Sequence, residues 1–168
     1  MRLRRSLSKA EGFTLTELVC TLIILGVLAA QALPGFVDLS DEAYDSMVRS
    51  MGGSLSIAVL LATADCKIRG WAGRDNLPGY ATGQVDFNAA CHPTDTGNAN
   101  LIGGSAARCA RVWQAVLASA PSIQTGAAGS ADYRALAAGE ICRFRFIHDA
   151  TPVREITYNA ATGDVGLP

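Results

Sequence analysis

Glu17 is an acidic residue inside an otherwise apolar run, and its chemistry needs an explanation. The run covers residues 13–33 and reads FTLTELVCTLIILGVLAAQAL. A carboxylate within an apolar membrane segment costs roughly a few kcal/mol and is rarely kept without a partner. Cleavage between Gly12 and Phe13 would create an α-amino cation close to it in sequence. In an assembly of identical helices, the amine of one copy could pair with Glu17 of a neighbour and specify their register.

Five cysteines form the second chemical group of the sequence. Cys20 lies inside the apolar run, and the other four follow it at Cys66, Cys91, Cys109 and Cys142. Four is a pairable number, no C-x-x-C motif occurs, and an exported domain meets an oxidising environment, so we expect two disulfides. Buried free thiols in a cytosolic domain are the less favoured alternative. Four cysteines allow three connectivities.

Catalytic constellations with supporting context are absent from the sequence. It has no G-x-x-x-x-G-K-[ST], G-x-G-x-x-G, G-x-S-x-G or H-E-x-x-H motif. His92 and His148 could join the cysteines in a zinc site, but their spacings match no familiar pattern, so we favour disulfides. Asp164 lacks the ligand spacing of a calcium site. We therefore expect that the chain is not an enzyme and that it binds no cofactor and no metal.

The charges are distributed unevenly along the chain. Lys and Arg number 14 and Asp and Glu 15; without residues 1–12, which hold four basic and one acidic residue, 10 and 14 remain, a net charge of −4. An acidic body gives no general electrostatic case for nucleic-acid binding. A candidate basic patch would consist of Arg108, Arg111, Arg143 and Arg145. These arginines lack aromatic neighbours on their own face, so we interpret them as a solvated surface and expect no nucleic-acid partner.

The apolar run is about as long as the helix that crosses a hydrocarbon layer of roughly 30 Å. Basic residues precede it and acidic residues follow it, so the positive-inside rule predicts that the leader stays in the cytoplasm and the rest is exported. Three explanations compete: a signal peptide cleaved at the Ala-Gln-Ala site of residues 30–32, a plain anchor, and a leader that is removed while the apolar segment is kept. Glu17 favours the third, because the first two do not need a carboxylate.

The sequence GFTLTE at residues 12–17, followed by the apolar run, resembles the processing site of type IV pilins and pseudopilins. The basic leader, Gly12 before the cut, Phe13 at the new N-terminus, Glu17 at the fifth mature position and Pro34 all match that family. The resemblance implies that a prepilin peptidase cleaves after Gly12 and methylates the amine of Phe13. Thr16 departs from the aliphatic residue of many members, but its hydroxyl can bond a helix carbonyl.

The continuation LPGFVDLSDEA at residues 33–43 resembles, more narrowly, the mannose-sensitive haemagglutinin (MSHA) branch of pilins. Cys-x-x-x-Trp at Cys109 and Cys-x-Phe-x-Phe at Cys142 are similar to the same branch, where the resemblance implies that these two cysteines join. We therefore predict the disulfide pairs Cys109–Cys142 and Cys66–Cys91, the second of which brackets a long loop.

A long amphipathic helix is expected after the apolar run. Pro34 removes one backbone hydrogen bond and predicts a kink, after which the helix resumes. Gly52 and Gly53 weaken this helix and predict a bend or a close approach to a sheet. The apolar residues recur at steps of three and four and predict one face lying on the sheet. They are Tyr44, Met47, Val48, Met51, Leu55, Ala58 and Ala62.

The remaining sequence predicts a small sheet and a short helix. Residues 70–104 are rich in Gly, Asn, Asp, Thr and Pro and predict a surface connection with one short strand at 84–87. Ser105 is the expected N-cap of a helix that ends before Pro121. Alternation predicts a strand at 142–146, a hairpin partner at 153–158, and a turn at 159–163 towards a last strand.

The expected fold is therefore α+β. It fits the type IV pilin fold, in which a long kinked N-terminal helix, half transmembrane and half amphipathic, packs on a small antiparallel β-sheet. The expected layout is a cleaved leader at 1–12, a transmembrane and assembly helix at 13–33, its amphipathic continuation at 34–65 and a globular head at 66–168.

The expected function is that of a structural subunit of an MSHA-like type IV pilus used for surface adhesion. By the resemblance, the chain crosses the inner membrane once, is processed by prepilin peptidase, and joins identical or related subunits through the pilus assembly machinery. The product is an extracellular filament. The alternatives are a pseudopilin of a type II secretion system and a membrane-tethered exported binding domain.

Overall fold

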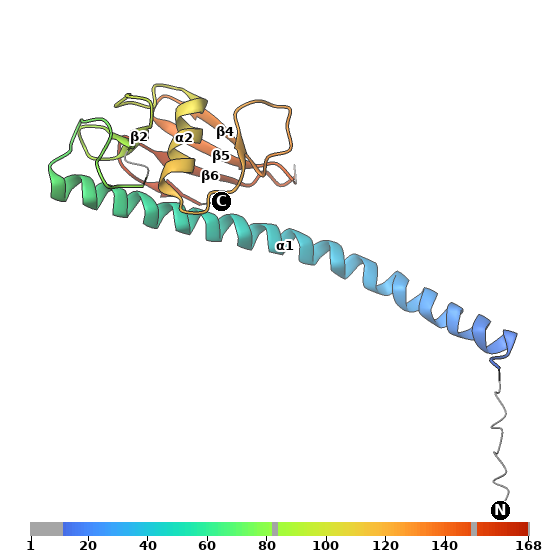
Figure 1. Cartoon of the computed structure of the whole chain (residues 1–168). Coiled ribbons are helices and arrows are strands. Elements are labelled where there is room, and N and C mark those ends of the chain that lie inside the picture. The colour runs from blue at the N-terminus through green and yellow to red at the C-terminus, as the bar shows by residue number, and fades with distance from the viewer. Residues whose placement is uncertain (1–11, 82–83, 149–150, 168) are drawn as a thin grey trace, which may run out of the picture. The chain divides into compact units, whose positions relative to one another are not determined.

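The structure is a computed structural model that describes residues 12–81, 84–148 and 151–167 of the chain, without the side chains of residues 32–39 (Figure 1). The chain divides into two compact units, Met1–Glu42 and Ala43–Pro168. The expected layout, with a globular head at 66–168, stays a prediction. The helix after residue 43 contributes to the core of the second unit. Each unit is described by itself below.

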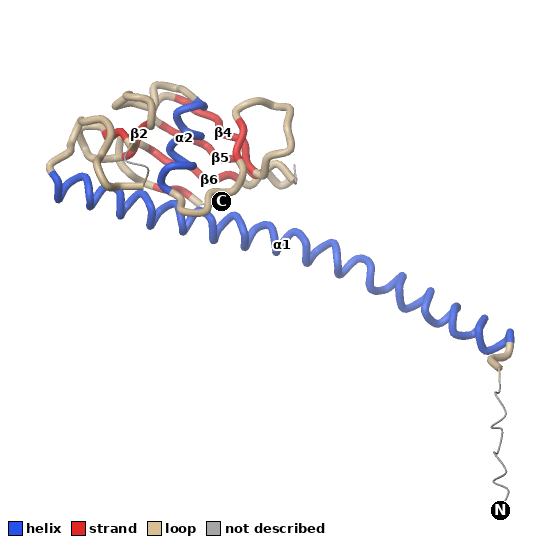
Figure 2. Tube along the Cα trace, in the orientation of Figure 1, coloured by secondary structure: helices blue, strands red, loops and turns tan. Residues whose placement is uncertain are grey.

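Helix α1, Leu15–Arg69, contributes to both units (Figure 2). Leu15–Gln31 is a short apolar helical stretch, and its large apolar side chains are exposed. Pro34 lies within α1, and the kink expected there stays a prediction. Ser40–Arg69 is long and apolar enough to cross a membrane by length and composition. That test does not make it a membrane span, because Val48, Leu55 and Ala62 are buried in the head.

The apolar stripe of α1 packs in the head with one change from the prediction. Val48, Leu55 and Ala62 are fully buried, as predicted, and Val59, which the stripe omitted, is 2% exposed. Met47 is 44% exposed, so its predicted place in the core is wrong. Neighbouring positions of a helix are about 100° apart, so the burial of Val48 turns Met47 towards solvent.

The main sheet of the head has five strands in the order β3-β4-β5-β6-β7. The strand pairs are antiparallel except β3 with β4, which is parallel. Helix α2, Ala106–Val116, lies in front of the central strands in Figure 1 and contacts β4 and β5. The strand bounds are β3 Ile123–Gln124, β4 Tyr133–Ala138, β5 Ile141–Phe146, β6 Glu155–Asn159 and β7 Val165–Gly166.

The structure confirms the predicted short helix, the strand at 142–146, its hairpin partner and the last short strand. Ser105 caps α2 as predicted, since its side chain accepts a hydrogen bond from the Arg108 amide. Strands β3 and β4 were not predicted. The connection at 70–104 holds two short strands rather than one, β1 Asp86–Phe87 and β2 Pro93–Asp95, which pair with each other.

The core lies between the helices and one face of the sheet. The Trp113 ring of α2 lies 4.9 Å from the Tyr133 ring and 4.7 Å from the Phe144 ring, measured between centroids. A second, smaller cluster gathers around the loop disulfide and includes Leu77 and Phe87. The fold is thus α+β, with a long N-terminal helix packed on an antiparallel sheet, as in the type IV pilin fold.

The two central glycines of α1 have different surroundings. A Cβ atom added at Gly52 would collide with Cδ2 of Leu167 and lie 3.5 Å from Ile156, whereas one added at Gly53 would meet nothing within 4 Å. The predicted close approach to the sheet therefore applies to Gly52 and not to Gly53.

Candidate functional site

The start of α1 is closed by a reciprocal set of hydrogen bonds between Thr14 and Glu17. The Thr14 amide and hydroxyl donate to Oε2 of Glu17 at 3.1 and 2.9 Å, and the Glu17 amide donates to the Thr14 hydroxyl at 3.2 Å. The Thr14 carbonyl accepts the first helical bond, from Leu18. This is a capping box with Thr14 as N-cap, and it satisfies amide groups that the first turn leaves unpaired.

The capping box gives Glu17 a function inside its own chain that the sequence analysis missed. Its signal was visible in the T-x-x-E spacing of residues 14–17, directly before an apolar run. The lone carboxylate is therefore not, by itself, evidence for assembly. The Oε1 atom of Glu17 takes no part in the three bonds with Thr14, so the cap still leaves one carboxylate oxygen for another partner.

The expected cleavage site lies immediately before this cap. Gly12 and Phe13 precede the helix and are exposed, Phe13 at 80% of its surface. Nothing lies within 4 Å of a Cβ added at Gly12. The bond between these two residues is therefore open to an enzyme in this structure.

The head contains two disulfides, and they join the pairs that the sequence analysis expects. The Cα atoms of Cys66 and Cys91 are 5.7 Å apart, and those of Cys109 and Cys142 are 5.5 Å apart. Cys20 is a free, exposed cysteine of α1. With all four head cysteines oxidised, none is available to bind zinc together with His92 or His148.

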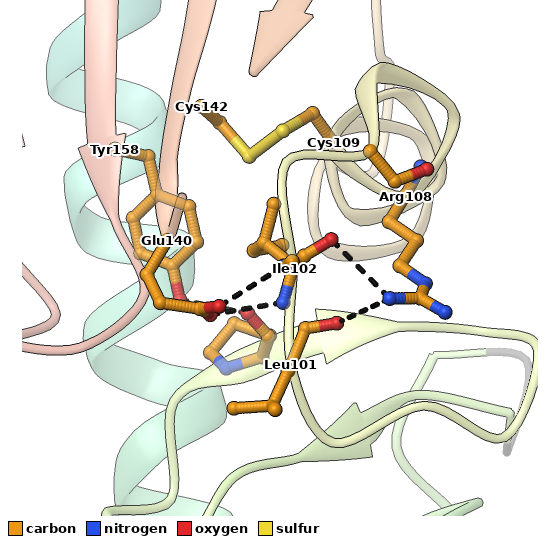
Figure 3. The surroundings of a disulfide bond; sticks show 10 residues. Leu101, Ile102, Arg108, Cys109, Glu140, Cys142 and Tyr158 are labelled. Carbon is orange, nitrogen blue, oxygen red and sulfur yellow. Dashed lines mark hydrogen bonds between the residues drawn. A yellow bond between two sulfur atoms is a disulfide. The ribbon is translucent and has the colours of Figure 1, made fainter. Parts of the chain in front are cut away.

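The Cys109–Cys142 disulfide lies beside a loop that is held from two sides (Figure 3). The Glu140 carboxylate accepts hydrogen bonds from the amides of Ile102 and Gly103, at 2.9 and 3.0 Å. On the other side, Arg108 donates to the carbonyls of Leu101 and Ile102, at 3.1 and 3.3 Å. These contacts fix the segment that leads into α2, which carries Cys109.

Tyr158 provides a further buried hydrogen bond near this disulfide. Its hydroxyl donates to the Pro93 carbonyl at 2.8 Å and thereby links β6 to β2. Burial, with the nearby charge of Glu140, raises the pKa of the Tyr158 phenol above its ordinary value. The phenol therefore stays protonated and serves as a donor.

The loop around Cys91 depends on Asn88, which the sequence analysis did not single out. Cys91 has a positive φ of 65°, a conformation uncommon for a residue with a Cβ. The Asn88 side chain accepts from the amides of Ala90 and His92 and donates to the Ala160 carbonyl. The only local signal is an Asn in a Gly- and Asn-rich stretch, which predicts a turn but no partner.

The four arginines considered as one basic patch belong to two groups. Arg108 and Arg111 contact the Asp95 carboxylate, which is 1% exposed, at 3.5 Å from Arg108 Nε and 3.1 Å from Arg111 Nη2. Burial raises the pKa of Asp95, but hydrogen bonds from Arg111 and the Thr96 amide and the two arginine charges outweigh it, so the pKa is below its ordinary value. Arg143 and Arg145 instead lie on β5 beside Glu155.

A serine, an aspartate and a histidine also meet at the edge of the sheet. The Ser122 hydroxyl donates to Oδ2 of Asp132 at 2.6 Å, and Nε2 of His148 lies 3.0 Å from Oδ1. The carboxylate stands between the other two groups, so no imidazole contacts the hydroxyl and none can activate it as a nucleophile. Among the described residues, no group of three or more His, Cys, Asp or Glu could hold a metal ion.

Comparison with known proteins finds similarity to components of type IV pili. The chain is 41% identical over 59 residues to the type IV narrow pilus major component PilA5 of Thermus thermophilus, covering 35% of this chain and 51% of that protein. It is 33% identical over 99 residues to the type IV major fimbrial protein FimA of Dichelobacter nodosus, covering 56% of this chain and 61% of that protein. The chain thus spans between half and two thirds of these curated relatives. No protein-family model and no solved structure matches it.

Proposed function

We propose that the chain is a structural, non-enzymatic subunit of a type IV pilus. The observation that carries the proposal is the exposed Gly12–Phe13 bond directly before a self-capped apolar helix. The similarity to a narrow pilus component and a major fimbrial protein supports it, as does a head with a long helix on an antiparallel sheet. A filament subunit needs such an apolar helix for packing and no catalytic site.

In this proposal, residues 13–33 hold the chain in the inner membrane as a single span before assembly. The exposed apolar side chains of Leu15–Gln31 are what a lipid environment or neighbouring helices would cover. A prepilin peptidase removes residues 1–12 and methylates the new amine of Phe13. The chain then leaves the membrane and joins identical or related subunits in an extracellular filament, with the help of the pilus assembly machinery.

Glu17 and Phe13 form the assembly contact in this proposal. Oε2 of Glu17 accepts the capping hydrogen bonds at the start of its own helix. Oε1 accepts a hydrogen bond from the Phe13 amine of a neighbouring subunit. Two opposite charges in an apolar interior specify the register of the helices more than they add stability. The MSHA-like character and the function in surface adhesion belong to the same proposal and rest on residues 33–43 and on the surroundings of Cys109 and Cys142.

The proposal is tested by intact mass and by electron microscopy. The mature protein is expected to begin at a methylated Phe13, and cells that lack the chain are expected to lose a class of surface filaments that returns on complementation. A mature chain beginning at Leu33 would instead indicate cleavage by signal peptidase after residues 30–32. A chain processed at Phe13 that never occurs in sheared filaments would also contradict the proposal, in favour of a pseudopilin or a tethered domain.

A further inference from the structure

One face of the main sheet carries three arginines and one carboxylate. In the part of the chain that the structure describes, α1 and α2 pack on the face formed by residues such as Ala135, Phe144 and Ile156. Side chains alternate along a strand, so the intervening residues lie on the opposite face. We call four of them the arginine face: Arg134, Arg143, Arg145 and Glu155.

The strand register places like charges directly opposite each other on this face. Arg134 of β4 is the cross-strand partner of Arg145 of β5, and Arg145 is in turn the partner of Glu155 of β6. Opposed like charges on adjacent strands are destabilising. With three guanidinium groups and one carboxylate, the arginine face carries a net charge of +2 if all four residues are ionised.

Glu155 does not satisfy all three arginines. Nε and Nη2 of Arg145 both donate to its Oε2 at 3.2 Å. Nε of Arg143 is 3.9 Å from Oε1, too far for a hydrogen bond. Among the described residues, the Nε atoms of Arg134 and Arg143 are shielded from solvent and have no hydrogen-bond partner. In the described part of this face, one carboxylate therefore stands against three guanidinium groups.

We propose that the arginine face binds an acidic polysaccharide through its carboxylate or sulfate groups. The guanidinium fork matches a planar carboxylate in a bidentate geometry. Arg143 and Arg145 are two residues apart on one strand, about 7 Å, and Arg134 is one strand away, about 5 Å. Because Glu155 engages Arg145, Arg134 and Arg143 offer two such sites, and two sites suit a polymer that repeats its charge along the chain. The side chains of Arg143 and Arg145 remain accessible, at 41% and 36% exposure.

Nucleic acid fits the same face less well. The outward residues of β4, β5 and β6 include no aromatic side chain on which bases could stack. The head unit, residues 43–168, holds ten basic and ten acidic residues, so it offers no net attraction for a polyanion as dense as duplex DNA. Binding of a polysaccharide by the arginine face needs only the folded subunit and is independent of filament assembly.

The experiment measures binding of the full chain in detergent to immobilised polygalacturonate, with neutral dextran and a 20-base-pair duplex DNA as comparison probes. Wild type is expected to bind polygalacturonate, and the Arg134→Gln/Arg143→Gln variant to bind at least tenfold more weakly. Arg49→Gln removes an exposed arginine of α1 outside this face and is expected to bind within twofold of wild type. Glu155→Gln removes the opposing carboxylate and is expected to bind several-fold more tightly.

Four results would overturn the inference. They are no binding of wild type to polygalacturonate, an equal loss in Arg49→Gln, tighter binding to the duplex DNA, and an unchanged or weaker affinity of Glu155→Gln. Near-ultraviolet circular dichroism and disulfide mapping report whether each variant folds. The gain expected for Glu155→Gln keeps the test decisive if the double arginine variant does not fold, since an unchanged or weaker affinity contradicts the inference. A failure of filament assembly would leave these measurements unaffected.

Discussion

At the scale of the single residue, the Glu17 carboxylate has two functions. It caps the start of its own helix, and in the proposed filament it also pairs with the Phe13 amine of a neighbour. Two substitutions distinguish the capping function of Glu17 from its pairing function. Gln at position 17 keeps a capping oxygen and removes the charge, whereas Ala at position 14 removes the cap hydroxyl and keeps the charge.

Glu17→Gln is expected to remain processed and membrane-held but to enter filaments poorly. The neighbour's amine would be buried without a counter-charge, a penalty of roughly a few kcal/mol. Thr14→Ala loses about 1 kcal/mol of helix capping and is expected to enter filaments near the wild-type level. The measurement is the amount of subunit in sheared filaments relative to membranes. Normal entry of Glu17→Gln would refute the pairing, and an equal defect in Thr14→Ala would assign the effect to the cap.

Asp95→Asn is expected to destabilise the head by about 1–3 kcal/mol at pH 7, because two arginines lose an ionised acceptor. The folded pKa of Asp95 is below its ordinary value, so its contribution is complete above the unfolded pKa and is lost as pH falls through the folded pKa. The difference from wild type in urea unfolding should therefore shrink below about pH 4. A difference that stays constant down to pH 3 would contradict this assignment.

The bonding partners of single residues were predictable from the sequence where a residue type has few possible partners. Four head cysteines leave three pairings, and the structure contains the expected pair of bonds. Arginines have many possible partners, so the grouping of Arg108 and Arg111 around Asp95, and of Arg134 with Arg143, depends on folded geometry. Asn88 could not be found for the same reason, because one of its partners is Ala160, far away in sequence.

The adjacent glycines Gly52 and Gly53 of α1 give a matched test at the scale of the element. Gly53→Ala is expected to stabilise the chain by about 0.5–1 kcal/mol, because Ala is the better helix former and the added Cβ meets open space. Gly52→Leu is expected to destabilise it, because the side chain would collide with Leu167 and reach Ile156. Thermal unfolding of the detergent-solubilised chain should show shifts of opposite sign. Shifts of the same sign would refute the close packing at Gly52.

Strands were predictable where their residues alternate in polarity. Strand β5 reads ICRFRF, with buried Cys and Phe alternating with Arg, and it was found. Strand β4 reads YRALAA, where small Ala residues on both faces hide the alternation, and it was missed. Strand β1 has two residues and lies in the loop closed by Cys66 and Cys91, and β2 has three residues and begins just after Cys91. Segments this short are too brief to show an alternation in polarity, so local patterns do not predict their pairing.

At the scale of the whole molecule, the head unit has the features of a domain that folds alone. It holds both disulfides and the aromatic core around Trp113. Its first helical turns contribute to that core, since Val48 is fully buried and the Tyr44 ring lies 5.3 Å from the Phe146 ring. Arg154, directly before β6, also pairs with Asp45 of α1. The boundary between residues 42 and 43 therefore separates the disulfide-bonded core from the segment before it.

A chain that begins at residue 41 is accordingly expected to fold without detergent when it is secreted to an oxidising compartment. It keeps every buried residue of the head and should contain both disulfides. A chain that begins at Gly53 lacks Tyr44, Val48 and Asp45, and loss of the Val48 side chain and the aromatic contact should cost more than about 3 kcal/mol. The measurements are non-reduced peptide mapping and thermal unfolding. If the longer chain fails to form both disulfides, or the shorter chain unfolds at the same temperature, the first turns after residue 43 do not belong to the folding unit.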